Sequence, residues 1–233
     1  MQRMLLSTVC TLALVLPASP APASVDDGHT HDGDFGLHVE AGDIHAHPRV
    51  IGGLLGAEQD DSSTAPGFDA EPGTFPDGSA VGFDILEPLG LWNGDGFDPL
   101  DPATDEVLAI TYVFGLDIER RDTAGGFVTG FDVPVAGDGS WHQHLTWTLL
   151  GDGGSLTGVP DAGVYLLTLQ LRSSAEEIGP SEPLYLVFDS DAGEAAHEAA
   201  IDWTRTNLIP EPASLAVLGL GAGLLLTRRR QAG

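Results

Sequence analysis

The sequence predicts an all-β fold: an antiparallel β-sandwich, followed by one helix and a C-terminal transmembrane segment. Strand-sized apolar runs recur from residue 80 to residue 190, bounded by Gly, Pro and Asp and without helical patterns between them. Several of these runs alternate apolar and polar residues, as strands with one buried face do. The predicted strands span residues 80–85, 107–116, 126–135, 141–149, 163–172 and 183–188.

The run 141–149 shows the alternation most clearly. Successive side chains of a strand point to opposite faces, so Trp141 and Trp147 share one face while His142 and His144 share the other. We expect the tryptophans in the core and the histidines outside. The run 107–114 is nearly all apolar and is predicted to be a central strand.

The sequence divides into five segments by composition. We predict a signal peptide at 1–23, a His- and Asp-rich N-terminal part with a loop at 24–79, the β-sandwich at 80–190 (one domain with 34–55), a helix at 191–208, and a C-terminal tail at 209–233 with its transmembrane segment at 213–227. The loop covers residues 56–76, which are rich in Gly, Pro, Asp and Ser.

The helix prediction depends on spacing. Asp191 and Glu194 form an Asp-x-x-Glu pair that resembles a capping box. Ala195, Ala199 and Trp203 follow at intervals of four and indicate the face that packs on the domain.

The N-terminus has the features of a secretory signal peptide. Arg3 precedes the apolar run 5–16, and small residues then lead to an A-x-A pattern with cleavage after Ala23. The only cysteine, Cys10, lies inside this segment, so the mature protein has neither disulfides nor a thiol nucleophile.

The C-terminus combines three parts. Pro210, Glu211 and Pro212 precede an uncharged apolar stretch at 215–226, which a basic end follows. The basic end consists of Arg228, Arg229 and Arg230. Arginines at this position are what the positive-inside rule expects of a segment halted in the membrane, and a stretch shorter than about 20 residues suits a transient anchor.

These three parts resemble the PEP-CTERM sorting signal of Gram-negative bacteria. The resemblance implies export through the secretion machinery, membrane anchoring by the C-terminal segment, and processing of the tail by an exosortase. It also implies delivery to the cell surface or to the extracellular matrix.

The charge between the two ends is strongly acidic. Of 35 acids one, Glu211, is in the tail, and of nine basic residues four are in the ends, which leaves 34 acids and five arginines; the chain has no lysine. Such a field repels nucleic acid and attracts cations, so nucleic-acid binding is excluded. The acidity fits either solubility in a salty habitat or the gathering of cations. Without lysine, no P-loop lysine, Schiff-base lysine or Ser-Lys dyad is possible.

Histidines are the main candidates for a binding site. Seven of the eight fall in two short regions, and three His-x-His pairs occur where this composition predicts about 0.3 by chance. Two histidines at such spacing on a strand point to the same side, and imidazoles bind Zn²⁺, Cu²⁺ or Ni²⁺ with carboxylates completing the shell. The predicted ligands, with zinc as the expected metal, are His29, His31, His38, His45, His47, His142, His144 and Asp43.

Two other interpretations of the histidines stay open. They can be ordinary surface residues of an acidic protein, the role that we assign to His197 beside Glu194 and Glu198. Residues 25–34 can also act as a His-rich arm that binds metal weakly without a defined site.

Calcium is a second possible cofactor. Residues 93–98 read Asn-Gly-Asp-Gly-Phe-Asp and offer oxygen ligands with turn-forming glycines. They lack the twelve-residue spacing and terminal Glu of an EF-hand, so a plain loop is the preferred interpretation.

A second resemblance concerns the predicted domain. The stretch 141–149, followed by Gly163-Val164-Tyr165, is similar to the His-x-His-x-x-Trp and Gly-x-Tyr pattern of surface-anchored proteins associated with zinc or manganese ABC transporters. The arrangement from the early His-x-His elements through 91–94 to 181–185 is similar to PEP-CTERM proteins repressed by the zinc-uptake regulator. This resemblance implies extracytoplasmic zinc acquisition or storage, with components of a metal ABC transporter as partners.

We expect a binding protein and not an enzyme. The sequence has no Gly-x-Ser-x-Gly elbow, no His-Glu-x-x-His helix and no reactive cysteine, although a glycosidase carboxylate pair would leave no linear signature. The alternative is a structural or adhesive matrix protein associated with exopolysaccharide. A shared metal site requires the two histidine regions to converge, whereas a matrix protein would present an exposed sheet edge or an aromatic platform.

Overall fold

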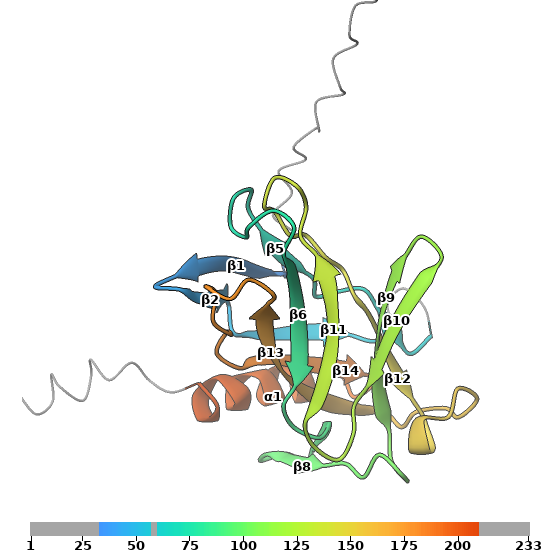
Figure 1. Cartoon of the computed structure of the whole chain (residues 1–233). Helices are drawn as coiled ribbons and strands as arrows, with labels where there is room; N and C mark the ends of the chain where they lie inside the picture. The colour runs from blue at the N-terminus through green and yellow to red at the C-terminus, as the bar shows by residue number, and fades with distance from the viewer. Residues whose placement is uncertain (1–32, 57–59, 210–233) are drawn as a thin grey trace, which may run out of the picture.

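The computed structural model describes residues 33–56 and 60–209, which form β-sheets and one C-terminal helix (Figure 1). The predicted signal peptide and the tail from Pro210 onward lie outside these residues. The strands are β1 Phe35–Glu40, β2 Asp43–His47, β3 Val50–Leu54, β4 Ser62–Ser63, β5 Phe68–Ala70, β6 Ala80–Ile85, β7 Gly90–Trp92, β8 Phe97–Pro99, β9 Val107–Phe114, β10 Asp117–Asp122, β11 Val128–Pro134, β12 Thr146–Leu150, β13 Gly163–Ser173 and β14 Leu184–Ser190. The helix α1 spans Glu194–Asn207.

The strands form three sheets. Their orders are β2-β1-β5, β10-β9-β12-β4 and β11-β6-β13-β14-β3, and β7 and β8 join the last sheet through β13. The mostly β fold with a helix after the last strand is therefore confirmed. The expectation of purely antiparallel pairing is wrong for β1 with β5 and for β3 with β14, which are parallel. Neither pair is joined by a tight turn, so nothing local forces an antiparallel direction.

All six predicted strands exist, but the loop predicted at 56–76 is wrong because it contains β4 and β5. The run 141–149 also divides between two sheets. Only its second half belongs to β12, whereas Gln143 exchanges backbone hydrogen bonds of 2.9 Å with Phe68 in β5. Three-residue strands such as β5 are too short to show alternation in a sequence.

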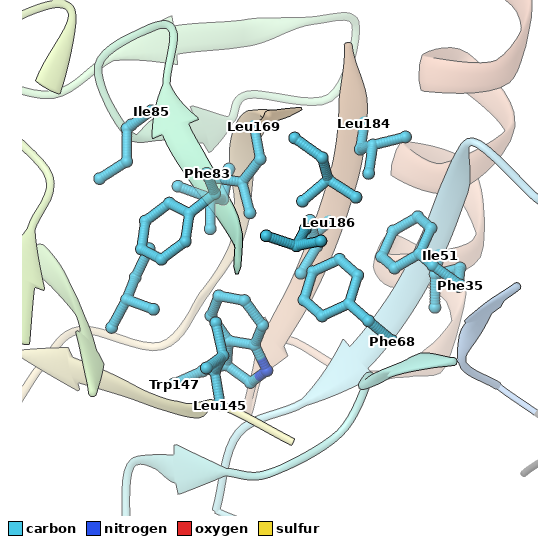
Figure 2. Packing of buried hydrophobic residues seen from close by; sticks show 14 of the residues in the cluster. Phe35, Ile51, Phe68, Phe83, Ile85, Leu145, Trp147, Leu169, Leu184 and Leu186 are labelled. Atoms are coloured by element: carbon cyan, nitrogen blue, oxygen red, sulfur yellow. The ribbon is translucent and has the colours of Figure 1, made fainter. Parts of the chain in front are cut away.

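The main hydrophobic core collects side chains from all three sheets (Figure 2). The ring of Phe68 stacks on Phe35 with centroids 5.4 Å apart and contacts Trp141 and Trp147. Trp147 is fully buried, and its indole N–H donates to the carbonyl of Pro66 at 3.0 Å. A buried N–H that finds an acceptor avoids the cost of desolvation. The predicted inward direction of the two tryptophans is confirmed.

A second, smaller core lies under α1. It contains Val164, Leu166, Tyr185 and Val187 from β13 and β14, together with Ala200 of the helix. The helix therefore covers the other face of the seven-stranded sheet, and both faces of β13 are buried along most of its length.

The predicted details of the helix are wrong in two respects. The helix buries Ala200 and Thr204, whereas Ala195 and Ala199 are exposed. Gly193 stands at the N-cap and no side chain caps the helix, so the expected capping box is absent. Residues spaced by four lie on two adjacent faces of this helix, one with Ala195 and Ala199 and the other with Ala200 and Thr204. The face with Ala200 and Thr204 packs against the sheet.

His197 is not the ordinary surface residue that we expected. It is half-buried, and its Nε2 lies 2.8 Å from the carbonyl oxygen of Val187 in β14. Gly52 in β3 leaves the space that this ring fills, because a Cβ there would lie 2.9 Å from Nε2.

The predicted central strand β9 is internal to its sheet, but its end leaves the core. Val107 to Ile110 are buried, whereas Val113 and Phe114 are exposed, as is Ile118 across the hairpin. No helix within 33–56 or 60–209 is long and apolar enough to cross a membrane. The transmembrane segment predicted at 213–227 lies outside those ranges.

One close approach of strands requires glycine. Gly130 lies at the irregularity where the register of β11 with β6 shifts, between Thr129 and Asp132. A Cβ at Gly130 would collide with the backbone carbonyl oxygen of Phe83 and lie 2.6 Å from its ring.

We expect Gly130→Ala to lower the free energy of unfolding by about 1–3 kcal/mol, because an added methyl group overpacks this contact. Urea denaturation measures the change. Gly126→Ala is the control, since a Cβ there meets no atom within 4 Å. An equal loss of stability in both variants would contradict the role of the contact.

Candidate metal centre

The hairpin β1–β2 presents histidines on its outer face. Leu37 and Ile44 point into the core, so the alternate residues His38 and His45 point outward. The two histidines are directly opposite each other, and their rings stack with centroids 5.4 Å apart. His47 follows on the same face, opposite Gly36.

The strand β5 and the segment 141–143 extend this face. Gly36 of β1 is paired with Asp69 of β5, and Ala70 exchanges backbone hydrogen bonds with Trp141 on the other side. Asp69 and His142 therefore lie on the outer side, and their contact of 3.1 Å between Oδ1 and Nδ1 agrees with this placement. The outer side of the layer β2-β1-β5-(141–143), with His144 beyond it, is called the histidine face.

The two histidine regions share a face but not one coordination shell. Strand spacings of about 4.8 Å place the backbone of β1, with His38, roughly 10 Å from the segment 141–143, and that of β2, with His45 and His47, roughly 14 Å from it. The predicted ligand Asp43 lies at the far end of the hairpin, where it bridges to Gly179. His29 and His31 lie outside the described residues and stay predictions.

His142 and His144 form the pair with the more developed surroundings. Their ring centroids are 5.0 Å apart. In each ring Nδ1 faces an oxygen acceptor, Asp69 Oδ1 at 3.1 Å for His142 and the carbonyl of Thr64 at 3.0 Å for His144. A carbonyl or a carboxylate only accepts, so Nδ1 carries the hydrogen. This assigns Nε2 as the nitrogen that can bind a metal, the usual arrangement of zinc-ligating histidines.

Asp34 supplies a carboxylate to the same place. Its side chain is 6% exposed, and Oδ1 accepts a hydrogen bond of 2.6 Å from the backbone N–H of Gly67. The other oxygen, Oδ2, lies 3.4 Å from His144 Nε2 but has no hydrogen-bond partner in the described part of the chain. The distance is that of an ion pair, yet the alignment is not that of a hydrogen bond.

The spacing of these two atoms matches metal ligation. Two atoms bound to one tetrahedral zinc ion at about 2.0–2.1 Å lie about 3.3–3.4 Å apart. Gly67 is required for the arrangement, because a Cβ there would lie 2.7 Å from Nδ1 of His144. Over residues 33–56 and 60–209, no group of three or more His, Cys, Asp or Glu side chains is arranged to hold a metal ion. The geometry therefore supplies two donor atoms at ligand spacing and not a complete shell.

Sequence reasoning missed Asp69, Thr64 and Gly67 because they fall in the predicted loop. Asp34 lies near the N-terminal histidines in the sequence, but only the fold brings it to His144. The signal that could have found β5 is its single apolar-polar-apolar alternation, Phe68-Asp69-Ala70, which three residues leave ambiguous.

Two oxygens of the candidate calcium loop, Oδ1 of Asn93 and Oδ2 of Asp98, accept hydrogen bonds within the loop. Asn93 Oδ1 accepts hydrogen bonds of 3.0 Å from the N–H groups of Asp95 and Gly96. Its side-chain amide donates to Asp98 Oδ2 at 3.1 Å. Calcium would have to break these bonds, which favours the interpretation as a plain loop.

Comparisons with known proteins leave the function to be argued from this geometry. No protein-family model matches the sequence, and no curated protein or solved structure matches it.

The substitution Asp34→Asn tests whether Asp34 is a metal ligand or a partner in a structural ion pair. The amide keeps an oxygen for Gly67 and turns an N–H toward His144 Nε2. We therefore expect the metal-free variant to be as stable as the wild type, or more stable by up to about 1 kcal/mol, the net contribution of one hydrogen bond.

The measurement is urea denaturation with a chelator present. A loss of about 1.5–3 kcal/mol would instead show that Asp34 stabilises the metal-free fold through a charged hydrogen bond.

Proposed function

We propose that this chain is an exported envelope protein that binds a transition-metal ion, with zinc as the expected metal, and serves metal acquisition or storage. The observation that carries the proposal is the buried Oδ2 of Asp34, which faces His144 Nε2 at 3.4 Å without a hydrogen-bond partner in the described part of the chain. In this proposal the role is binding and not catalysis.

His142 is the third ligand in the proposal. Its ring lies 5.0 Å from that of His144, and rotation about its side-chain bonds would bring Nε2 toward the same ion. The side chain of Asp69, which now contacts Nδ1, would have to follow the ring to keep orienting it. Water or a further side chain would complete a tetrahedral shell.

The donor set favours zinc over calcium. Imidazole nitrogens suit Zn²⁺, Cu²⁺ and Ni²⁺, whereas Ca²⁺ takes six to eight oxygens. The acidic charge of the chain, net −26, would concentrate cations of either kind near the surface. Selectivity would therefore come from His142 and His144.

The ion would also join distant parts of the chain. Asp34 precedes β1, whereas His144 lies between the segment 141–143 and β12. A metal that binds both residues only in the folded state stabilises the fold.

The sorting proposal depends on the two ends. We infer that the described sheets and helix form the β-sandwich of one exported domain, carried by the predicted signal peptide. The tail with Pro210, Glu211 and Pro212 would be recognised by an exosortase after the C-terminal segment anchors the chain. The cell surface or extracellular matrix of a Gram-negative bacterium is the expected location, and a metal ABC transporter is a candidate partner.

We expect calorimetric titration to detect roughly one zinc ion per chain, with micromolar affinity or tighter. The sample is the full chain in detergent, without a polyhistidine tag. The double variant His142→Ala/His144→Ala should weaken this site by at least about 10–100-fold, the loss seen when only orienting partners are removed. Asp34→Asn should also weaken it, and acid should abolish it because protons compete for Nε2.

The matched control is His38→Ala/His45→Ala, which removes the other histidine pair of the same face. This variant should keep the site at His142 and His144. A variant with His29 and His31 changed to alanine measures the contribution of the N-terminal histidines. If no protein binds zinc saturably, a structural or adhesive matrix protein becomes the better interpretation.

A further inference from the structure

Three aromatic side chains meet at the surface between the β7–β8 hairpin and α1. Trp92 and Phe97 are directly paired across the hairpin, with ring centroids 5.1 Å apart. Trp203 of α1 lies 6.0 Å from Trp92 and 5.7 Å from Phe97. All three side chains are half-buried, so each also contacts solvent. These three residues are called the aromatic platform.

Two independent elements hold the platform in place. The hairpin loop is fixed by the hydrogen bonds of Asn93 to Asp95, Gly96 and Asp98. The helix is fixed by burial of Ala200 against β13 and β14. Trp203 then lies across the loop backbone, since a Cβ at Gly96 would be 3.5 Å from its ring. Such a surface loses little conformational entropy when a ligand binds.

The polar atoms around the platform include both donors and acceptors. Neither the Trp92 nor the Trp203 indole N–H donates a hydrogen bond to any residue that the structure describes. The side chain of Asp95, in the hairpin loop between Trp92 and Phe97, is exposed and offers carboxylate oxygens. A ligand that fits this surface needs an apolar face, groups that accept from N–H, and groups that donate to carboxylates.

Sugar hydroxyls meet this requirement because each hydroxyl both donates and accepts. The C–H face of a sugar ring supplies the apolar surface that indole rings bury. Anionic sugars would be repelled by the carboxylates and by the net charge of −26. A cationic group would use the ring faces and carboxylates but not the indole N–H donors. The rings also contact one another directly, which leaves no cage between them for a cation.

We propose that the aromatic platform binds a neutral carbohydrate chain. The platform uses β7, β8 and α1, whereas the candidate metal centre uses β1, β5 and residues 141–144. Figure 1 shows β5 and β8 at opposite ends of the molecule. The proposal is therefore independent of metal binding.

The test is affinity electrophoresis of the full chain in detergent, in native gels that contain dextran, hydroxyethyl cellulose or soluble starch. At least one of these neutral polysaccharides should retard the wild type, whereas anionic alginate should not. Trp203→Ala should weaken binding roughly tenfold or more, as loss of a central aromatic contact does. Phe127→Ala removes an aromatic ring that is 62% exposed elsewhere on the surface, and it should bind like the wild type.

A second variant keeps the test decisive if Trp203→Ala unfolds. Asp95→Asn changes one exposed side chain and leaves the hydrogen bonds of Asn93 in place, and it should alter retardation by the same polysaccharide. Retardation by none of the three neutral polysaccharides would overturn the proposal, as would unchanged retardation in both a folded Trp203→Ala and the Asp variant. Quenching of tryptophan fluorescence by choline, without retardation by any glycan, would assign the platform to a cationic ligand instead.

Discussion

The pairing of β5 on both of its edges is the constraint on which the rest of the structure depends. This strand has three residues, yet it bonds to β1 on one side and to residues 141–143 on the other. Its central position also places the ring of Phe68 between Phe35 and the two tryptophans. Backbone pairing and core packing therefore stabilise the same register, and a slip by one residue would turn Phe68 outward and Asp69 inward.

The candidate metal centre follows from this register. The backbone of Gly67, just before β5, donates to Asp34, and the missing side chain of Gly67 makes room for His144. Asp69, one residue after Phe68, orients His142. Three short segments that are distant in sequence thus contribute one carboxylate, two imidazoles and their hydrogen-bond partners. None of the segments could hold the geometry alone, because isolated pairs of strands are marginally stable in water.

The alternation of apolar and polar residues along a strand made part of the fold and of the candidate site predictable from the sequence. The inward tryptophans and outward histidines of 141–149 follow from a period of two, which does not depend on the strand's partners. The strand partners themselves could not be predicted, because β5 carries too few residues to show a pattern, and the parallel pairs join segments that no tight turn connects. The helix shows the same limit. Its sequence allows two apolar faces, and only the position of Val187 and Ala200 in the second core decides between them.

The same limit explains why the number of histidines alone predicted more ligands for one site than the fold brings together. His38 and His45 stand on the same face as His142 and His144, but β5 lies between His38 and the segment 141–143, and both β1 and β5 lie between His45 and that segment. Shared orientation is a local property of each strand, whereas shared coordination requires a distance that only the sheet order sets. The residue that makes one pair different is an acid and not a histidine.

Asp34 is the residue that calls for an explanation in physical terms. A carboxylate that is 6% exposed loses its hydration, and this cost is normally offset by hydrogen bonds to both oxygens. Among the residues that the structure describes, only Gly67 donates such a bond, and it does so to Oδ1. The other oxygen, Oδ2, faces Nε2 of His144. Because Nδ1 carries the hydrogen of that ring, Nε2 presents a lone pair, so the lone pairs of Oδ2 and Nε2 face each other. A cation between them, either a proton or a metal ion, removes that repulsion. A proton shared in a linear hydrogen bond would bring the two atoms closer than 3.4 Å. A metal ion bound to both atoms fits the 3.4 Å separation.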